Sequence, residues 1–188
     1  MQVISSLLNL SSFEFGDSKV KTVFQECQKR VEVMALVHEK LCQSDCLCDV
    51  AFRKYICSLA ENIFFSYGID QSRIRLKVDG DNVNLSYTEA VPCGLIVNEI
   101  LSNALKHAFP DGRSGDIEIS IALLESNKVR LTISDNGVGL PPDMDPYTSN
   151  SFGLKIIITL AKQLKGKIEI TGTTGTRYCL EYEKNSSV

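Results

Sequence analysis

Four short segments, far apart along the chain, constrain what this sequence can fold into more than any other feature. Each combines glycine, hydroxyl, amide or charged residues with a place at the end of a predicted helix or strand, where such residues contact phosphates and nucleotides. In chain order they are residues 98–107 (NEILSNALKH), 135–139 (DNGVG), 151–154 (SFGL) and 172–176 (GTTGT). Each segment is weak alone, but their order and spacing predict that they meet at one ligand site.

The segment at residues 98–107 has the pattern of an amphipathic helix with one chemically useful stripe. Glu99, Asn103 and Lys106 stand at positions i, i+4 and i+7, which puts a carboxylate, an amide oxygen and an ammonium on one helical face. Oxygen ligands suit Mg²⁺, and an ammonium suits a phosphate. Taken alone, however, the segment is better explained as a solvated polar stripe.

The other three segments supply backbone groups and polar side chains. Asp135 ends a predicted strand and can accept a hydrogen bond from an exocyclic amine such as adenine N6, while Gly137 and Gly139 let the backbone approach a flat ligand. Gly153 begins a helix whose free N–H groups form an anion site, and Thr176 adds a hydroxyl. The alternatives are a glycine-rich turn, a plain helix start and a long hairpin loop.

The pattern around these segments predicts an α+β domain from residue 49 onward. Predicted helices cover residues 49–67, 89–108 and 152–164, and predicted strands cover residues 73–78, 83–86, 115–124, 128–135, 167–171 and 176–182. This order predicts an α+β sandwich in which helices cover one face of a single mixed sheet.

The first 45 residues have a different pattern, a heptad seam on two successive helices. Apolar residues recur at alternating steps of three and four, and Gly16 interrupts them. So short a turn predicts an antiparallel hairpin, and pairing with a second copy into a four-helix bundle would bury both seams. Packing of the hairpin on its own domain is the alternative. We predict a dimerisation hairpin at residues 1–48 and a ligand-binding domain at residues 49–188.

Charge and composition argue against a nucleic-acid-binding, a membrane-spanning or a secreted protein. A net charge of −3 gives no sign of a nucleic-acid partner. No apolar run approaches the roughly 20 residues that cross a bilayer, and no signal peptide is visible. The seven cysteines are odd in number and scattered, which favours free thiols in a reducing cytoplasm. We predict a cytoplasmic chain without membrane contact of its own, whatever anchors the full-length protein has elsewhere.

Together the four segments resemble the N, G1, G2 and G3 boxes of the GHKL ATPases, the superfamily of histidine kinases, gyrase, Hsp90 and MutL. The resemblance spans about residues 50–185 and implies the Bergerat ATP-binding fold, with ATP and Mg²⁺ as cofactors. Two longer stretches are similar to the HisKA-type-two group of sensor histidine kinases, relatives of the HWE kinases: residues 91–112 (VPCGLIVNEILSNALKHAFPDG) and 151–166 (SFGLKIIITLAKQLKG). Residues 1–10 (MQVISSLLNL) and 33–41 (VMALVHEKL) resemble the dimerisation helices of that group.

This resemblance implies the kinase core of a two-component sensor histidine kinase that works as a homodimer. Such a core transfers the γ-phosphoryl group of ATP to a histidine, and a response-regulator receiver domain then takes it. In the group, the accepting histidine stands a few residues before the segment matched by residues 1–10, so we expect it upstream of this chain. The implied catalytic residues are Glu99 and Lys106, the implied metal ligands are Asn103 and Glu99, and the implied nucleotide contacts are Asn103, Lys106, His107, Asp135, Gly137, Gly139, Ser151, Gly153, Leu154 and Thr176.

Departures from the family pattern leave alternatives open. Ordinary histidine kinases have asparagine where Glu99 falls, whereas gyrase-like ATPases have a glutamate there that activates water, so Glu99 is either a metal ligand or a base. Residues 151–154 contain one glycine where many kinases have two, and residues 140–150 form a short lid. The alternative functions are a GHKL serine kinase, an ATPase that uses Glu99 as its base, and a nucleotide-binding interaction module without catalysis.

His38 has sequence neighbours that are compatible with a phosphoacceptor site or a metal site. It precedes Glu39, as in a phosphoacceptor site, and it repeats every four residues with Cys42 and Cys46, a spacing that can bind Zn²⁺. It also lies on the heptad seam at the place of a core residue. We favour the core interpretation for all three side chains.

Overall fold

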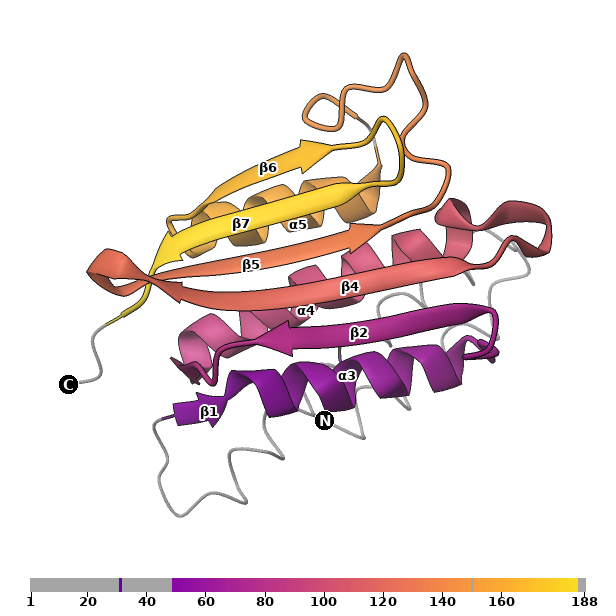
Figure 1. The fold of residues 1–188 in the computed structure, drawn as a ribbon. Coiled ribbons are helices and arrows are strands. Elements are labelled where there is room, and N and C mark those ends of the chain that lie inside the picture. The colour runs from indigo at the N-terminus through magenta and orange to yellow at the C-terminus, as the bar shows by residue number, and fades with distance from the viewer. Residues whose placement is uncertain (1–30, 32–48, 150, 186–188) are drawn as a thin grey trace, which may run out of the picture.

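The fold is taken from a computed structural model that describes residue 31, residues 49–149 and residues 151–185 (Figure 1). Apart from Val31, the predicted hairpin at residues 1–48 lies outside the described residues. The same holds for His38, Cys42 and Cys46. The dimerisation hairpin and the domain boundary at residue 49 therefore stay predictions.

The domain is built on a mixed sheet, as the sequence predicts, but this sheet has five strands because the strand predicted at residues 83–86 belongs to a separate small sheet. Its strands lie in the order β2-β4-β5-β7-β6, with β2 paired parallel to β4 and every other neighbouring pair antiparallel. The bounds are β2 (Ile74–Gly80), β4 (Gly115–Leu124), β5 (Lys128–Asp135), β6 (Lys167–Thr171) and β7 (Arg177–Glu183). Within one residue or two, these are the predicted strands.

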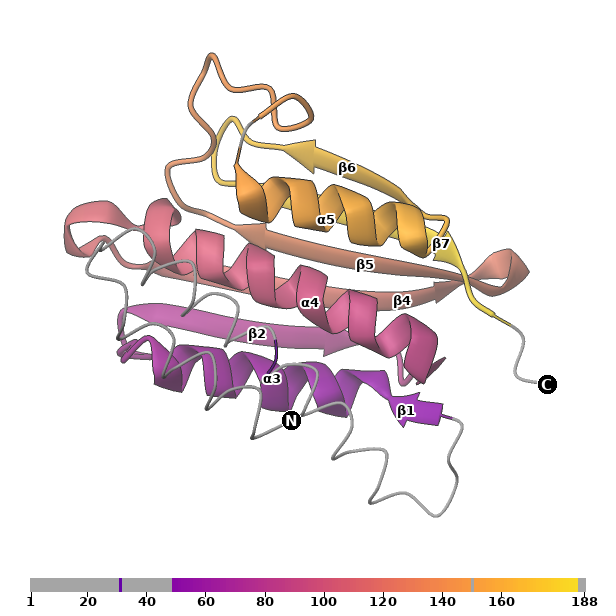
Figure 2. The ribbon, with the colours of Figure 1, turned by 180° about the vertical axis from the view of Figure 1, so that it is seen from behind.

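Three helices cover one face of this sheet: α3 (Phe52–Ser66), α4 (Tyr87–Asn103) and α5 (Phe152–Gln163). In Figure 1, α4 and α5 lie behind the strands and α3 runs beside β2 at the edge of the sheet; in Figure 2, α4 and α5 lie in front of the strands. Strand alternation explains the arrangement, because Ile117, Ile119 and Ile121 of β4 are buried under the helices while Glu118 and Ser120 between them are exposed. The sandwich has one apolar core, between the sheet and these helices.

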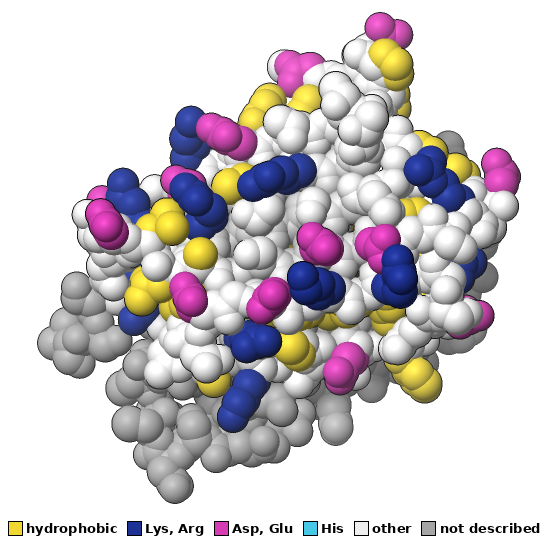
Figure 3. All heavy atoms as spheres, in the orientation of Figure 1, with side chains coloured by type: hydrophobic (Ala, Val, Ile, Leu, Met, Phe, Trp, Pro, Cys, Tyr) yellow, Lys and Arg dark blue, Asp and Glu magenta, His cyan; other side chains and the backbone are white. Residues whose placement is uncertain are grey.

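The opposite face of the sheet is open and carries charges of both signs, as Figure 3 shows. Cross-strand ion pairs join Arg75 to Asp116 at 2.7 Å and Arg130 to Glu181. All four side chains are partly exposed to solvent, so these pairs add little to stability. This face is solvated, and the functional residues gather elsewhere.

The start of α4 explains how the helix is held in place. Ser86 and Glu89 form a capping box, in which Glu89 Oε2 accepts from the Ser86 backbone N–H at 3.0 Å. Glu89 Oε1 also accepts from the Asn185 backbone N–H at 2.9 Å, which ties the chain end to the helix start. The helix begins two residues before the predicted start, so Pro92 lies in its second turn rather than its first. After Asn103 the helix continues into a wide π-helical turn, Ala104–Ala108.

The predicted start of the first helix, at residue 49, was wrong. The predicted helix from residue 49 begins at Phe52, because β1 (Asp49–Ala51) pairs antiparallel with β3 (Asn84–Ser86) in a separate two-stranded sheet. Val50 and Leu85, directly opposite each other, are both buried. A three-residue strand is too short for its alternation to be told from the first turn of a helix. Within residues 49–149 and 151–185, no helix combines the length and apolar character that a membrane span requires.

Candidate functional site

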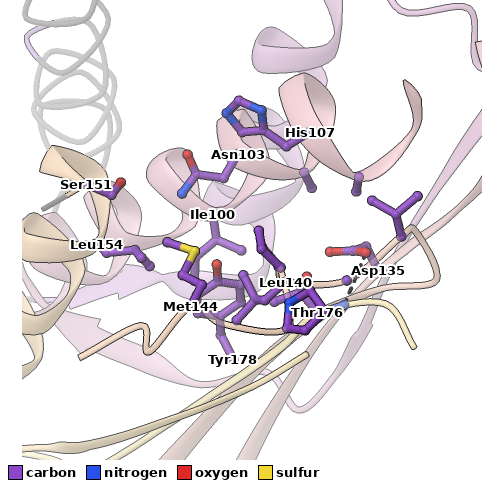
Figure 4. A pocket seen from close by; sticks show the side chains of 16 residues that line it. Ile100, Asn103, His107, Asp135, Leu140, Met144, Ser151, Leu154, Thr176 and Tyr178 are labelled. Carbon is purple, nitrogen blue, oxygen red and sulfur yellow. Dashed lines mark hydrogen bonds between the residues drawn. The ribbon is translucent and has the colours of Figure 1, made fainter. Parts of the chain in front are cut away.

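A cavity of about 500 Å³ lies where the C-terminal part of α4, the end of β5, the start of β7 and the loop after β5 meet. Its volume is in the range of small-molecule binding sites. The lining residues are Ile100, Asn103, Ala104, His107, Ala108, Asp135, Val138, Gly139, Leu140, Pro141, Pro142, Met144, Ser151, Leu154, Thr176 and Tyr178. Figure 4 shows the side chains converging from these elements, and most of them are apolar. The cavity therefore suits a flat, largely apolar group with a few polar edges.

Asp135 supplies the carboxylate of this cavity. Its Oδ1 accepts from the backbone N–H groups of Gly137 at 2.9 Å and Thr176 at 3.2 Å. Its own backbone N–H donates to the Thr176 carbonyl at 2.9 Å, so the end of β5 and residue 176 are tied together twice. Oδ2 accepts no hydrogen bond from any residue that the structure describes. The carboxylate is fixed through one oxygen and offers the other as an acceptor to a ligand.

Two glycines allow the loops around Asp135 to interlock. A Cβ on Gly137 would lie 2.3 Å from the Ala108 carbonyl oxygen, and one on Gly175 would lie 2.0 Å from the Asp135 carbonyl oxygen. Gly175 also has φ +75°, a conformation that favours glycine. Val138 then donates from its backbone N–H to the Ala108 carbonyl at 3.0 Å. The glycines of the 135–139 and 172–176 segments are needed for this close packing of backbone on backbone.

A second, smaller cavity of about 210 Å³ adjoins the first and is much more polar. It is lined by Tyr67, Asn98, Glu99, Ser102, Asn103, Lys106, His107, Ser151, Phe152 and Gly153. Three residues line both cavities: Asn103, His107 and Ser151. One ligand with a flat end and a charged end can therefore occupy both.

In the polar cavity, the predicted stripe of α4, Glu99, Asn103 and Lys106, faces the start of α5. Glu99 is buried, and its Oε1 accepts from Asn98 Nδ2 at 3.5 Å. A Cβ on Gly153 would lie 3.1 Å from Glu99 Oε2 and 3.6 Å from Asn103 Nδ2. Glycine at residue 153 thus lets the first turn of α5 approach both side chains. The N-terminal end of α5 adds positive partial charge to this cavity through the helix dipole.

The donor set of this second cavity fits a hard divalent cation together with phosphate oxygens. Glu99 and Asn103 offer a carboxylate and an amide oxygen side by side, and Lys106 lines the same cavity. Mg²⁺ is commonly bound by one or two protein oxygens, with phosphates and waters completing the octahedron. The residues present therefore fit Mg²⁺ held jointly by protein and nucleotide.

The structure places ten of the eleven predicted site residues in these two cavities. Gly137 lines neither, and it acts through its N–H to Asp135 and its contact with Ala108. Two of the three threonines of the 172–176 segment, Thr173 and Thr174, line a separate groove with Arg113 and Asn136. The structure thus brings these residues together, while the role of each stays a prediction.

The first cavity has an apolar wall that was not predicted from the sequence. Ile100, Ala104 and Ala108 line it at four-residue spacing, next to the stripe of Glu99 and Asn103. That four-residue spacing is the signal in the sequence that could have identified them as wall residues. Tyr178 was also missed, although it lies two residues after Thr176 on β7 and so shares its face.

Tyr178 forms part of the cavity floor as a neutral hydroxyl group. Burial and the nearby Asp135 carboxylate raise the pKa of Tyr178 to about 12, and the Asn103 side chain opposes that rise. The phenol therefore stays protonated at neutral pH. It gives the cavity a polar group that carries no charge.

Two family models match the chain. One, described as "Histidine kinase", matches residues 1–67. The other, described as "Histidine kinase-, DNA gyrase B-, and HSP90-like ATPase", matches residues 88–186, slightly more than half of the chain.

Curated relatives extend over nearly the whole chain at modest identity. Blue-light-activated histidine kinase 2 of Erythrobacter litoralis is 28% identical over 188 residues, which are 94% of this chain and 51% of the relative. Sensor histidine kinase PdtaS of Mycobacterium tuberculosis is 27% identical over 178 residues, which are 94% of this chain and 34% of the relative. The chain thus spans between a third and about half of the length of these relatives.

Solved structures agree with the fold. The histidine kinase domain of an Erythrobacter litoralis blue-light-activated histidine kinase matches with a TM-score of 0.77 and 23% identity, over 97% of this chain and 93% of that chain. A longer structure of a blue-light-activated histidine kinase from that organism matches with a TM-score of 0.73 and 28% identity, over 83% of this chain and 53% of that chain.

Proposed function

Because the chain belongs to the histidine kinase-, DNA gyrase B- and HSP90-like ATPase family, we propose that it is the ATP-binding kinase core of a two-component sensor histidine kinase. The observation that carries this proposal is the pair of adjoining cavities, one apolar with the Asp135 carboxylate and one polar with Glu99, Asn103 and Lys106. ATP has the matching division into a flat base and a charged triphosphate. The activity, the receiver-domain partner and the homodimer are part of the proposal.

The base binds in the larger cavity. Asp135 Oδ2 accepts a hydrogen bond from the adenine N6 amine, while Oδ1 stays held by Gly137 and Thr176. The apolar side chains around it, such as Ile100 and Met144, pack on the ring faces. Because Asp135 is an acceptor at this edge, a base with a carbonyl oxygen there is disfavoured. This is the physical basis for preferring ATP over GTP.

The triphosphate extends into the smaller cavity, where the kinase chemistry takes place. Lys106 and the N-terminal N–H groups of α5 stabilise negative charge on the phosphates. Asn103 and Glu99 would hold Mg²⁺, which would neutralise charge on the phosphates. The loop at residues 140–149 covers the base side and limits the access of water. The bond between the γ-phosphorus and the bridging oxygen of ATP breaks, ADP leaves, and a histidine nitrogen takes the phosphoryl group, which then passes from that nitrogen to an aspartate of a receiver domain.

The function is tested by two measurements. Calorimetry on this chain should detect Mg²⁺-dependent ATP binding, and no binding would favour an interaction module with a degenerate site. The full-length protein incubated with γ-labelled ATP should acquire acid-labile, base-stable phosphate on histidine. Release of free phosphate without a phosphoprotein would favour an ATPase, and acid-stable phosphoserine on a partner would favour a serine kinase.

Replacing Glu99 by glutamine distinguishes a metal ligand from a base. We expect a metal ligand, so the gain in ATP affinity on adding Mg²⁺ should fall by roughly tenfold, the scale of losing one partner around a bound metal. Affinity measured in excess chelator should stay unchanged. The matched control is Glu61→Gln on the exposed face of α3, which should leave both affinities as they are. An unchanged Mg²⁺ effect together with lost ATP hydrolysis would identify Glu99 as the base of an ATPase instead.

We also propose that the chain dimerises through residues 1–48. The heptad seams of the sequence motivate this, and the histidine kinase family model covers the same residues. A chain that begins at Asp49 should be monomeric and should bind ATP as tightly as the whole chain, because both cavities are built from later residues. Light scattering at tens of micromolar tests the first point. A monomeric whole chain at that concentration would contradict the proposal.

A further inference from the structure

The loop between β5 and α5 is attached to the edge of the sheet by one side chain, Tyr147. Its hydroxyl donates to the Ile168 carbonyl at 3.3 Å and accepts from the Ile170 backbone N–H at 3.1 Å. Both partners belong to β6, which is an edge strand of the five-stranded sheet. Tyr147 itself remains 52% exposed. The attachment thus depends on the hydroxyl and not on deep burial of the ring.

The geometry of an edge strand explains why a hydroxyl fits there. On an edge strand, alternate residues direct their carbonyl and N–H groups away from the sheet, where no neighbouring strand pairs with them. Ile168 and Ile170 are two residues apart, so their outward carbonyl and N–H form one such pair. A hydroxyl can donate and accept at the same time. Tyr147 therefore supplies the two hydrogen bonds that a neighbouring strand would otherwise make.

The rest of the loop connects this attachment to the base cavity. Asp145 Oδ1 accepts from the Tyr147 backbone N–H at 2.9 Å, and Oδ2 accepts from the Thr148 hydroxyl at 3.0 Å. On the other side, the Leu140 N–H donates to the Gly172 carbonyl at 3.1 Å, and the Met144 N–H donates to the Pro141 carbonyl at 3.0 Å. Met144 lies between the two fixed points. Leu140 and Met144 both reach into the cavity wall (Figure 4).

We propose that Tyr147 is a positioning residue for nucleotide binding, because its hydroxyl fastens the loop at residues 140–149 to β6 and so keeps Met144 and Leu140 in the wall of the base cavity. The role rests on the proposed ATP function. Without the attachment, the loop samples more conformations, and ATP binding has to order it. Loss of the hydroxyl therefore weakens ATP binding although Tyr147 touches neither cavity.

A simpler role is protection of the edge strand. A covered edge resists pairing with another chain, and Tyr147 would serve that purpose whatever ligand the cavity binds. The two roles make different predictions. Edge protection changes hydrogen exchange at β6 and leaves nucleotide affinity alone, whereas positioning changes both.

The test compares Tyr147→Phe with the wild-type chain and with Tyr87→Phe as the matched control. Tyr87 is also partly exposed, and its hydroxyl makes no hydrogen bond with the residues that the structure describes. In Tyr147→Phe the Ile170 amide should exchange about tenfold faster without nucleotide, and ATP affinity should fall about threefold to tenfold, the scale of one or two neutral hydrogen bonds. Asp145→Ala should weaken ATP binding in the same direction. Tyr87→Phe should change neither quantity.

Several outcomes would overturn the role. Faster Ile170 exchange with unchanged ATP affinity leaves only edge protection. Higher affinity in Tyr147→Phe means that the attachment holds the loop away from the ligand. Unchanged exchange means that the hydrogen bonds to β6 are absent in solution. A wild-type chain that binds no ATP removes the proposed function and this role with it, whereas wild-type binding that Tyr147→Phe leaves unaltered removes this role alone.

Discussion

Replacing Asp135 by asparagine should lower the affinity for ATP at least about tenfold, because a charged hydrogen-bond partner of a buried polar group contributes roughly 1.5–3 kcal/mol. The two N–H groups that hold Oδ1, from Gly137 and Thr176, both require an acceptor. An asparagine side chain that satisfies them must turn its NH₂ group toward the cavity. That group then meets the N6 amine of adenine, and two donors face each other. Calorimetry with Mg²⁺ present measures the loss.

A nucleotide without the amine provides the internal control for this prediction. The triphosphate of unsubstituted purine riboside should lose much less affinity than ATP in Asp135→Asn, because it presents no donor to the new amide. Asp111→Asn is the matched protein control, since Asp111 is exposed on the 110–112 turn and lines neither cavity. Equal losses for both nucleotides would assign the effect to a disturbed loop. No loss for ATP would remove Asp135 from the adenine site.

The sequence predicts best those elements in which apolar and polar residues repeat with a regular spacing over many positions. β4 and β5 alternate over ten and eight residues, and the predicted bounds are the observed ones. β1 spans three residues and owes its existence to pairing with β3, a partner more than thirty positions away. No local pattern carries that information. The same reason explains the early start assigned to α3.

Part of the candidate site could likewise be predicted from the sequence, and part could not. Asp135, Asn103 and Lys106 could be predicted because their chemistry is visible in the residue type and their spacing in the segment. The apolar wall could not, because a cavity-lining Ile100 or Met144 has the same composition as a core residue. What decides between cavity and core is whether another side chain fills the space, and that depends on tertiary packing. The attachment of Tyr147 to β6 also cannot be predicted from the neighbouring sequence, because its hydrogen-bond partners lie more than twenty residues later.

Gly175→Ala should destabilise the domain and weaken ATP binding together. The substitution places a Cβ 2.0 Å from the Asp135 carbonyl oxygen in a backbone at φ +75°. The left-handed conformation costs an alanine roughly 1–2 kcal/mol, and overpacking against a rigid neighbour adds about 1–3 kcal/mol. The neighbour is rigid because β5 and residue 176 are joined by the Asp135 N–H to Thr176 carbonyl bond at 2.9 Å and the Thr176 N–H to Asp135 Oδ1 bond at 3.2 Å. Urea unfolding should show a lower midpoint, and calorimetry a lower affinity.

Gly112→Ala separates the cost of the left-handed backbone conformation from the cost of the steric clash. Gly112 has nearly the same backbone angle, φ +76°, but a Cβ there meets no atom within 4 Å. Its substitution therefore carries the conformational cost alone, reduced by the lower entropy of an unfolded chain with alanine. The unfolding free energy should fall by no more than about 1 kcal/mol, and ATP affinity should not change. If Gly175→Ala behaved in the same way, the loop at residues 172–176 would be free to move away from Asp135. The close packing that fixes the Asp135 carboxylate would then not be rigid in solution.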